Sequence, residues 1–212
     1  MTEALEQRLR AVLDPIESWR EDAPATRSDY DMNPGTLPFV DGPLRHAAVL
    51  VAIVPRPEGA TVILTRRADT LTSHTGQVAF PGGRLDPGET ALEAALREAE
   101  EEIGLDPGRV RPIGLGDTYE TGSRFVVTPV VAMVDLPFHL TLSPDEVAEA
   151  FETPLDFLMD AANHRREALM FKGSERFFWA MPWDDAGTER YIWGATAGMI
   201  RALSLRFKAA AA

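Results

Sequence analysis

The stretch GRLDPGETALEAALREAEEEIGL, residues 83–105, carries a full set of signals for one helix. Thr90 is a good N-cap, and Glu93 three residues later completes a capping box. Gly104 is suited to the left-handed conformation that ends many helices. The sequence therefore predicts a helix from about Ala91 to Ile103.

Glutamates crowd the second half of this helix. At 100° per residue, Glu98, Glu101 and Glu102 share one edge of the helix, whereas Glu93 and Glu100 point towards solvent. The shared edge borders the apolar stripe that anchors the helix. This stripe consists of Leu92, Ala95, Leu96, Ala99 and Ile103. Like charges on one edge repel each other, so the pattern indicates either a solvated acidic face or a cation site.

The position of the acidic edge favours the cation site. Isolated acid pairs at this spacing cost only a few tenths of a kcal/mol, which a solvated face tolerates. The acidic edge, however, lies next to a Gly-rich loop that allows close backbone approach, and clustered carboxylates suit Mg²⁺ or Mn²⁺. Cysteine is absent from the chain and no histidines cluster, which argues against zinc. Arg97 is placed to reach Glu93 or Glu101 and to hold a carboxylate in place.

The composition of the chain excludes several classes of function. The 212 residues are 45% apolar and 25% charged, which fits one globular domain with extensions. The absence of cysteine excludes disulfides and a cysteine nucleophile. A net charge of −12 repels phosphate backbones, so no nucleic-acid partner is expected. The N-terminus does not resemble a signal peptide and no apolar run is long enough for a membrane span, so a cytoplasmic protein is expected.

The chain divides into an N-terminal extension and a folded domain. Residues 3–19 have helical apolar spacing, which predicts a helix packed against the domain or against a twin subunit. Residues 21–43 are rich in Pro, Asp and Gly and predict an irregular connector. We therefore divide the chain into an extension, 1–43, and a domain, 44–212.

Strand and helix patterns alternate within the domain. The expected elements are strands at 46–54, 61–67, 111–119 and 124–134, two short helices within 144–162, an aromatic strand pair within 165–183, and a helix from about 194. Such interleaving predicts an α/β sandwich with a mixed central sheet. The aromatic stretch at 175–183 is typical of a sheet core or of a homodimer surface.

Residues 83–105 also resemble a known sequence motif, the Nudix box. The box reads Gly, five residues, Glu, seven residues, Arg-Glu, an apolar residue, any residue, Glu-Glu, any residue, Gly and an apolar residue. Its positions are occupied here, without a gap, by Gly83, Glu89, Arg97, Glu98, Ala99, Glu101, Glu102, Gly104 and Leu105. Ala99 is smaller than the aliphatic residue usual at its position.

The resemblance implies a fold and a chemistry. It implies an α/β/α sandwich with a loop–helix–loop catalytic motif, and hydrolysis of a nucleoside diphosphate linked to another moiety. Glu98 and Glu102 would be the principal ligands of Mg²⁺ or Mn²⁺, and Glu101 a further ligand or a water contact. Glu98 is alternatively the general base. Glu89 and Arg97 would order the loop.

The residues upstream of the box resemble the signature of the coenzyme A diphosphatase branch of this family. That pattern is roughly L-L-T-x-R-S-x-x-L-R-x-H-x-G-Q-V-A-F-P-G-G-x-x-D. The matching residues are Leu64, Thr65, Arg67, Leu71, His74, Gly76, Gln77, Val78, Ala79, Phe80, Pro81, Gly82, Gly83 and Asp86. The departures are Ile63 for Leu, Ala68 for Ser and Thr72 for Arg. The last departure removes a cation that would face a substrate phosphate.

Five residues of this stretch are candidate substrate contacts. Arg67 suits a substrate phosphate because guanidinium groups bind anions through paired hydrogen bonds. His74 lies in a polar segment and either contacts substrate or caps a turn. Gln77 alternates with the apolar residues of a short strand. Gly82 and Gly83 serve the turn or allow the backbone to approach phosphate.

Glu146 has two interpretations. Many members of the family carry an acid after the box that assists the metal or activates water, which makes Glu146 a catalytic candidate together with Glu98 and Glu101. The stretch SPDE at 143–146 is also a good helix start, with Ser143 as N-cap and Glu146 closing a capping box. The local pattern favours the cap.

The resulting hypothesis is a metal-dependent coenzyme A diphosphatase acting on a small nucleotide substrate. Its products would be adenosine 3′,5′-bisphosphate and 4′-phosphopantetheine or the acyl form. The alternatives are another Nudix hydrolase, acting on ADP-ribose, a dinucleotide such as NADH or a nucleotide sugar, and a non-catalytic Nudix-fold binding module. A binding module would be expected to lose box acids, and all of them are present here.

Overall fold

The computed structural model describes residues 2–38, 40–68, 76–171 and 173–210. In chain order the first elements are α1 (Thr2–Val12), the 3-10 helix η1 (Ile16–Ser18), β1 (Arg27–Ser28), β2 (Arg45–Arg56), β3 (Gly59–Arg67), β4 (Val78–Ala79), β5 (Gly82–Arg84) and α2 (Ala91–Ile103). The later elements are η2 (Pro107–Arg109), β6 (Val110–Leu115), β7 (Tyr119–Glu120), β8 (Phe125–Val134), β9 (Val147–Pro154), α3 (Leu155–Met159), η3 (Ala161–Asn163), β10 (Arg165–Phe171), β11 (Ser174–Asp185), β12 (Thr188–Trp193) and α4 (Gly194–Ala210). None of the helices within these ranges is long and apolar enough to cross a membrane.

A mixed sheet forms the centre of the fold. Its strands follow the order β1-β7-β8-β2-β3-β4, with β5 added to β2, β6 to β8 and β9 to β3. β2 pairs with β8 in parallel and with β3 and β5 in antiparallel. The expected α/β architecture with a mixed sheet is confirmed, and the pairing of β5 with β2 places the Gly-rich loop beside the middle of the sheet.

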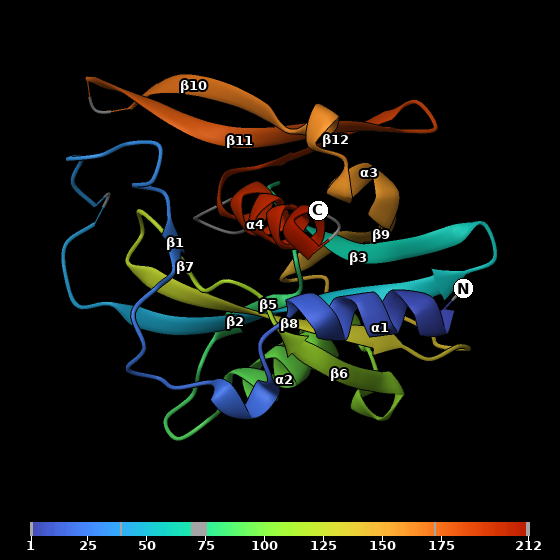
Figure 1. Ribbon diagram of the computed structural model, residues 1–212. Coiled ribbons are helices and arrows are strands. Elements are labelled where there is room, and N and C mark those ends of the chain that lie inside the picture. Colours follow the sequence, from blue (N-terminus) through green and yellow to red (C-terminus); the bar gives the residue numbers. More distant parts are fainter. Residues whose placement is uncertain (1, 39, 69–75, 172, 211–212) are drawn as a thin grey trace.

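Both faces of β2 are buried, as its continuous apolar run predicts. Successive side chains of a strand point to opposite faces, so the run supplies two separate cores. One core contains Ala48, Leu50, Ala52 and Val54 of β2 together with the alanines of α2. The other contains Ala47, Val51 and Ile53 together with residues of α4, α1 and α3. Helix α2 therefore packs on one face of the sheet and α4 on the other (Figure 1).

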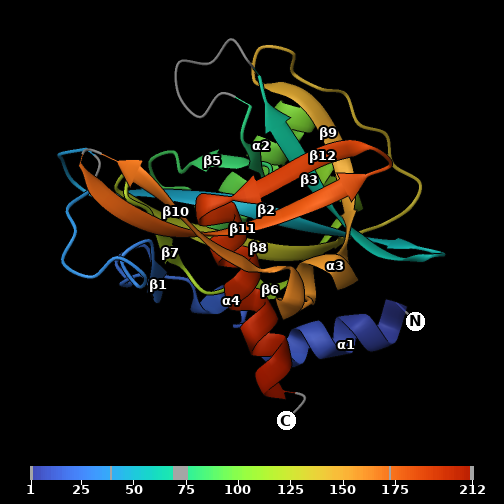
Figure 2. The same cartoon turned by 90° about the horizontal axis from the view of Figure 1, so that it is seen from above.

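A second sheet, β10-β11-β12, lies on the far side of α4. Figure 1 shows α4 between this sheet and the central one, and in Figure 2, seen from above, the three overlap. The predicted aromatic strand pair corresponds to β10 and β11. The prediction missed the third strand of this sheet, β12. Met181 and Ile192 face the core, and Trp183 packs against Phe151 of β9 with ring centroids 6.3 Å apart. These apolar contacts join the two sheets.

The N-terminal extension packs against the domain of its own chain. α1 ends at Val12, so the helix predicted over 3–19 is too long; a break at 13–15 separates it from η1. Leu9 is fully buried in the core that α4 shares. β1 pairs with β7, and Asp14 forms a β-bridge with Leu115. The connector thus adds an edge to the central sheet.

The first of the two helices predicted within 144–162 is wrong. Residues 144–146 form a turn, and the chain then continues as β9 along β3. Only α3, followed by the single turn η3, is helical in this range. β-sheet pairing with β3, rather than the local start signal, decides the conformation here.

Candidate active site

Helix α2 begins and ends as its sequence predicts. The Thr90 side chain accepts from the Glu93 N–H, and the Glu93 carboxylate accepts from the Thr90 N–H at 2.8 Å, which completes the capping box. Gly104 closes the helix with φ 65°. The buried face is shifted slightly from the predicted stripe: it consists of Ala91, Ala94, Ala95, Ala99, Glu102 and Ile103, while Leu92 and Leu96 are half-buried.

The four glutamates at the end of α2 have different environments. The Glu102 side chain is 4% exposed and that of Glu98 is 15% exposed. Glu101 is 57% exposed, and Glu100 faces solvent as predicted. Two of the three acids on the predicted edge are therefore shielded from water, which raises the cost of their charge.

Glu102 is a buried carboxylate with little compensation. Its Oε2 accepts from the Gly82 N–H at 3.2 Å, and its Oε1 lies 3.7 Å from a guanidinium nitrogen of Arg67. Burial, reinforced by the charges of Glu98 and Glu146, raises the Glu102 pKa from the usual 4.5 to about 7, although the Gly82 N–H and Arg67 oppose this. A divalent cation would relieve this repulsion.

Glu98 lies directly under the Gly-rich loop. A Cβ on Gly83 would come within 2.5 Å of the Glu98 carboxylate, so only glycine leaves room for the acid at this position. Gly82 is equally restricted, because a Cβ there would lie 2.3 Å from the Ala48 carbonyl oxygen on β2. Burial raises the pKa of Glu98, and the charges of Glu101 and Glu146 add to this, while Arg97 lowers it.

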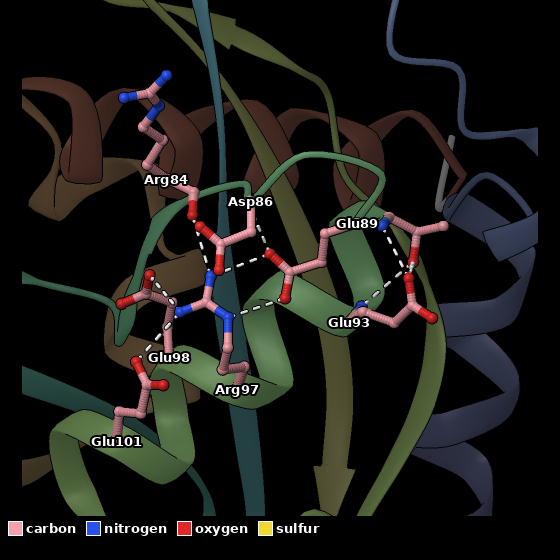
Figure 3. A network of polar contacts seen from close by, with 8 residues as sticks. Arg84, Asp86, Glu89, Glu93, Arg97, Glu98 and Glu101 are labelled. Atoms are coloured by element: carbon pink, nitrogen blue, oxygen red, sulfur yellow. Dashed lines mark hydrogen bonds and ion pairs between the residues drawn. The ribbon is translucent and has the colours of Figure 1, made fainter.

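Arg97 holds the loop and the acidic edge together (Figure 3). It donates to Glu89 through Nε at 2.8 Å and through a second nitrogen at 3.0 Å. It also donates to Glu98 at 2.9 Å and to Glu101 at 3.1 Å. A further bond at 3.0 Å reaches the main-chain oxygen of Arg84, a contact that no side-chain pattern could have predicted. The expected supporting role of Glu89 and Arg97 agrees with this geometry, but the alternative contact of Arg97 with Glu93 is not made.

Glu146 lies near the same acids, in the turn that precedes β9. The Ser143 N–H donates to the Glu102 carbonyl oxygen at 2.9 Å, and the Ala68 N–H donates to the Glu146 carbonyl oxygen at 2.8 Å. These bonds place the turn between the end of α2 and the end of β3. Because no helix follows and the Ser143 N–H is already engaged, the helix-cap interpretation of Glu146 is wrong. Its charge raises the pKa of both Glu98 and Glu102, so it lies within electrostatic range of each.

Some of the candidate substrate contacts upstream of the box lie next to these acids. Val78 and Phe80 are buried core residues, as expected for the short strand. The Gln77 carbonyl oxygen accepts from the Arg67 N–H at 3.0 Å, which aligns the two residues across β3 and β4. His74 lies outside the described residues. Arg67, Gly82 and Gly83 are thus brought to the box acids, and Gln77 joins them through its main chain.

The donors at this site suit a hard divalent cation. Oxygen ligands of high negative charge are those that Mg²⁺ and Mn²⁺ prefer. The charges of Glu98 and Glu102 repel each other, and Gly83 leaves room for the Glu98 carboxylate because it has no Cβ. Within the described ranges, however, no three Asp, Glu or His side chains already surround one point closely enough for a metal. Glu101 is engaged by Arg97, so a third ligand has to come from a side-chain rotation or from water.

The raised pKa of Glu102 predicts a particular pH dependence of stability. Between its usual pKa of 4.5 and about 7, the folded chain retains a proton that the unfolded chain has released. The free energy of unfolding of the metal-free protein should therefore fall as the pH rises through this window, by roughly 3 kcal/mol from this group. Urea denaturation in the presence of a chelator at pH 5 and pH 8 measures the decrease. Glu102→Gln removes the titrating group, so equal decreases in variant and wild type would contradict the prediction.

Comparisons with known proteins point to one family. The family described as NUDIX domain matches residues 44–172. A Cronobacter sakazakii protein named "Uncharacterized Nudix hydrolase NudL" is 42% identical over 165 residues, which cover 76% of this chain and 82% of that protein. Its Klebsiella pneumoniae namesake is 39% identical over 166 residues, covering 78% and 84%. A solved Nudix hydrolase from M. smegmatis, RenU, is 26% identical with a TM-score of 0.46, covering 55% of this chain and 74% of that one.

Proposed function

The chain belongs to the Nudix hydrolase family and is an enzyme of that family, and on this premise we propose that it hydrolyses the diphosphate bond of coenzyme A or of its thioesters. The products would be adenosine 3′,5′-bisphosphate and 4′-phosphopantetheine or its acyl form. One water molecule adds across one P–O–P bridge, so each product carries one phosphate of the former diphosphate. Mg²⁺ or Mn²⁺ is the proposed cofactor.

The observation that supports coenzyme A over other substrates is the stretch GQVAFPGG at 76–83. This stretch resembles the coenzyme A diphosphatase signature, and its last two glycines lie against the box acids. Gly82 donates to Glu102, and Gly83 lies over Glu98. Arg67, which belongs to the same signature, forms an ion pair with Glu102. The proximity of Arg67, Gly82 and Gly83 to the acidic edge supports the proposal that signature residues and box acids serve one site.

The residues of the site have different proposed roles in the reaction. A bound divalent cation would neutralise charge on the diphosphate and promote ionisation of a water molecule. Glu98 and Glu102 are the proposed ligands, with Glu101 as a further ligand or water contact. Arg67 supplies a guanidinium for a phosphate oxygen. The chain has a net charge of −12, so binding of an anionic diphosphate depends on these local cations.

We assign Glu146 as the proposed general base, since it is an exposed carboxylate within electrostatic range of Glu98 and Glu102. Glu146→Gln should lower kcat roughly 10²- to 10³-fold, the range typical for loss of a positioned base, and should leave KM within about threefold. Steady-state kinetics with coenzyme A measures both constants. Asp145→Asn, one residue away and also exposed, is the matched control and should keep its activity. A kcat for the Glu146 variant equal to that of the control would rule out the assignment.

Product analysis tests the substrate. The purified chain is incubated with coenzyme A, NADH or ADP-ribose, each with Mg²⁺ or Mn²⁺, and the products are identified by mass spectrometry. The expected result is a kcat/KM for coenzyme A well above that for the other two. A preference for NADH or ADP-ribose would favour the alternative of another Nudix hydrolase, and would show that the signature does not select coenzyme A here.

A further inference from the structure

Arg67 and Glu102 form an incomplete pair. One guanidinium nitrogen of Arg67 lies 3.7 Å from the Glu102 Oε1, which is within ion-pair range but too long for a hydrogen bond. The Arg67 Nε is buried and has no hydrogen-bond partner in the described structure. A buried donor without an acceptor is costly, so this arginine is held by charge rather than by a satisfied hydrogen-bond network.

Arg97 provides the contrast. It donates to Glu89, Glu98, Glu101 and a main-chain oxygen, and its side chain is thereby fixed in place. Arg67 has the same charge at the same acidic edge but only one ion pair in the described residues, and 30% of its side chain is exposed. Of the two cations, Arg67 is the one that can change partner at low cost.

Two hydrogen bonds hold the main chain at Arg67 and Ala68 beside the site, and neither of them involves the Arg67 side chain. The Arg67 N–H is bound by the Gln77 carbonyl, and the next N–H, that of Ala68, by Glu146. The register with β9 shifts here, so that Arg66 faces Glu149 while Arg67 faces Val147. Such irregularities in a ladder commonly redirect a side chain beside a functional site. Arg67 thus projects towards Glu102 from a hydrogen-bonded main chain.

We propose that Arg67 is an exchangeable counter-ion, which neutralises Glu102 while the divalent cation is absent and moves to a phosphate of the diphosphate substrate once that cation is bound. Arg67 and the divalent cation compete for Glu102 in the free enzyme. In the complex they bind different partners, and both then hold the substrate. The transfer to phosphate rests on the proposed function; the competition at Glu102 does not.

The proposal predicts opposite effects of one substitution. Arg67→Met keeps most of the side-chain length and removes the charge. Without substrate at pH 8.5, its affinity for Mn²⁺ should be roughly tenfold higher than that of wild type, because a competing unit charge is gone from a partly solvated site. With the metal saturating, the KM for coenzyme A should rise roughly tenfold, because a charge-assisted contact to phosphate is lost. If Arg67 only supported the fold, its substitution would weaken the binding of both Mn²⁺ and coenzyme A.

Mn²⁺ binding is measured by electron paramagnetic resonance of the free ion, with no substrate present. Arg66→Met is the matched control: it removes the neighbouring charge, whose side chain lies by Glu149, and should leave Mn²⁺ affinity within about twofold. Arg67→Lys keeps a charge but cannot bind phosphate through two nitrogens, so its Mn²⁺ affinity should stay near wild type while KM rises. This variant also serves if Arg67→Met does not fold.

Unchanged or weaker Mn²⁺ binding by Arg67→Met overturns the proposed competition. Raised Mn²⁺ affinity with an unchanged KM overturns the transfer to phosphate. If wild-type enzyme does not hydrolyse coenzyme A, the proposed function fails on its own, and the substrate-free Mn²⁺ titration still decides whether Arg67 competes with the metal.

Discussion

Glu102→Gln should lower the rate of diphosphate hydrolysis at least about a thousandfold. The amide has the shape of the carboxylate but lacks its charge, so a proposed metal ligand is lost and with it several kcal/mol of charge stabilisation in the transition state. Glu102 is 3% exposed and its charge interacts with that of Glu98, so the substitution removes one of two neighbouring shielded acids. Mn²⁺ titration and kcat/KM, both measured on the same preparation, report the two losses.

The folded state of this variant should be at least as stable as that of wild type. A buried carboxylate with a raised pKa destabilises the metal-free protein at neutral pH, and glutamine removes that cost. Glu100→Gln is the matched control, because Glu100 lies on the solvent face of the same helix. It should keep wild-type turnover. Full activity in Glu102→Gln would show that the acid is not a metal ligand.

Arg97→Met should have the second largest effect, on stability and activity together. Four partners lose their donor, and Glu89 and Glu98 are left as shielded carboxylates without a cation. Removing one partner of such a network typically costs 3–5 kcal/mol when buried, and about 2–4 kcal/mol is expected here because Arg97 is partly solvated. Urea denaturation at pH 8 measures the loss. Activity at saturating metal should fall roughly a hundredfold, since the loop over Glu98 is no longer held.

Arg111→Met is the control for loss of an arginine as such. Arg111 pairs with Glu6 and Asp135 at 3.0 Å each, but its side chain is 44% exposed. Exposed pairs of this kind contribute at most about 1 kcal/mol. If the two variants lose equal stability, Arg97 has no special role in the loop–helix–loop.

Much of the helix at the site could be predicted because its signals are local. Thr90, Glu93 and Gly104 act within one helical turn of the residues they cap, so their effect survives whatever the rest of the chain does. The same holds for β2, whose continuous apolar run requires burial on both faces. The box and the signature are contiguous in sequence, which is why a family resemblance could be stated from them.

Glu146 shows where local signals were insufficient. Ser143, Pro144 and Glu146 satisfy every rule for a helix start, yet the chain forms a turn and then a strand. The deciding bonds come from distant residues, with the Ser143 N–H bound by Glu102 and the Glu146 carbonyl by Ala68. If this segment became a helix, its backbone hydrogen bonds to the sheet would be lost. The free-energy cost of that loss depends on distant residues, so the four residues of the local pattern do not reveal it.

The sequence by itself determined the helix, its caps, the family and the set of acids that share an edge. Only the tertiary structure decided how those acids differ: Glu102 is buried against Gly82, Glu98 lies under Gly83, and Glu101 is turned to solvent and Arg97. The physical reason is that the spacing of residues on a helix determines the side to which each side chain points. Its burial depends instead on which other elements pack against that side of the helix. The cost of a charge, and hence its capacity to bind a cation, follows from burial.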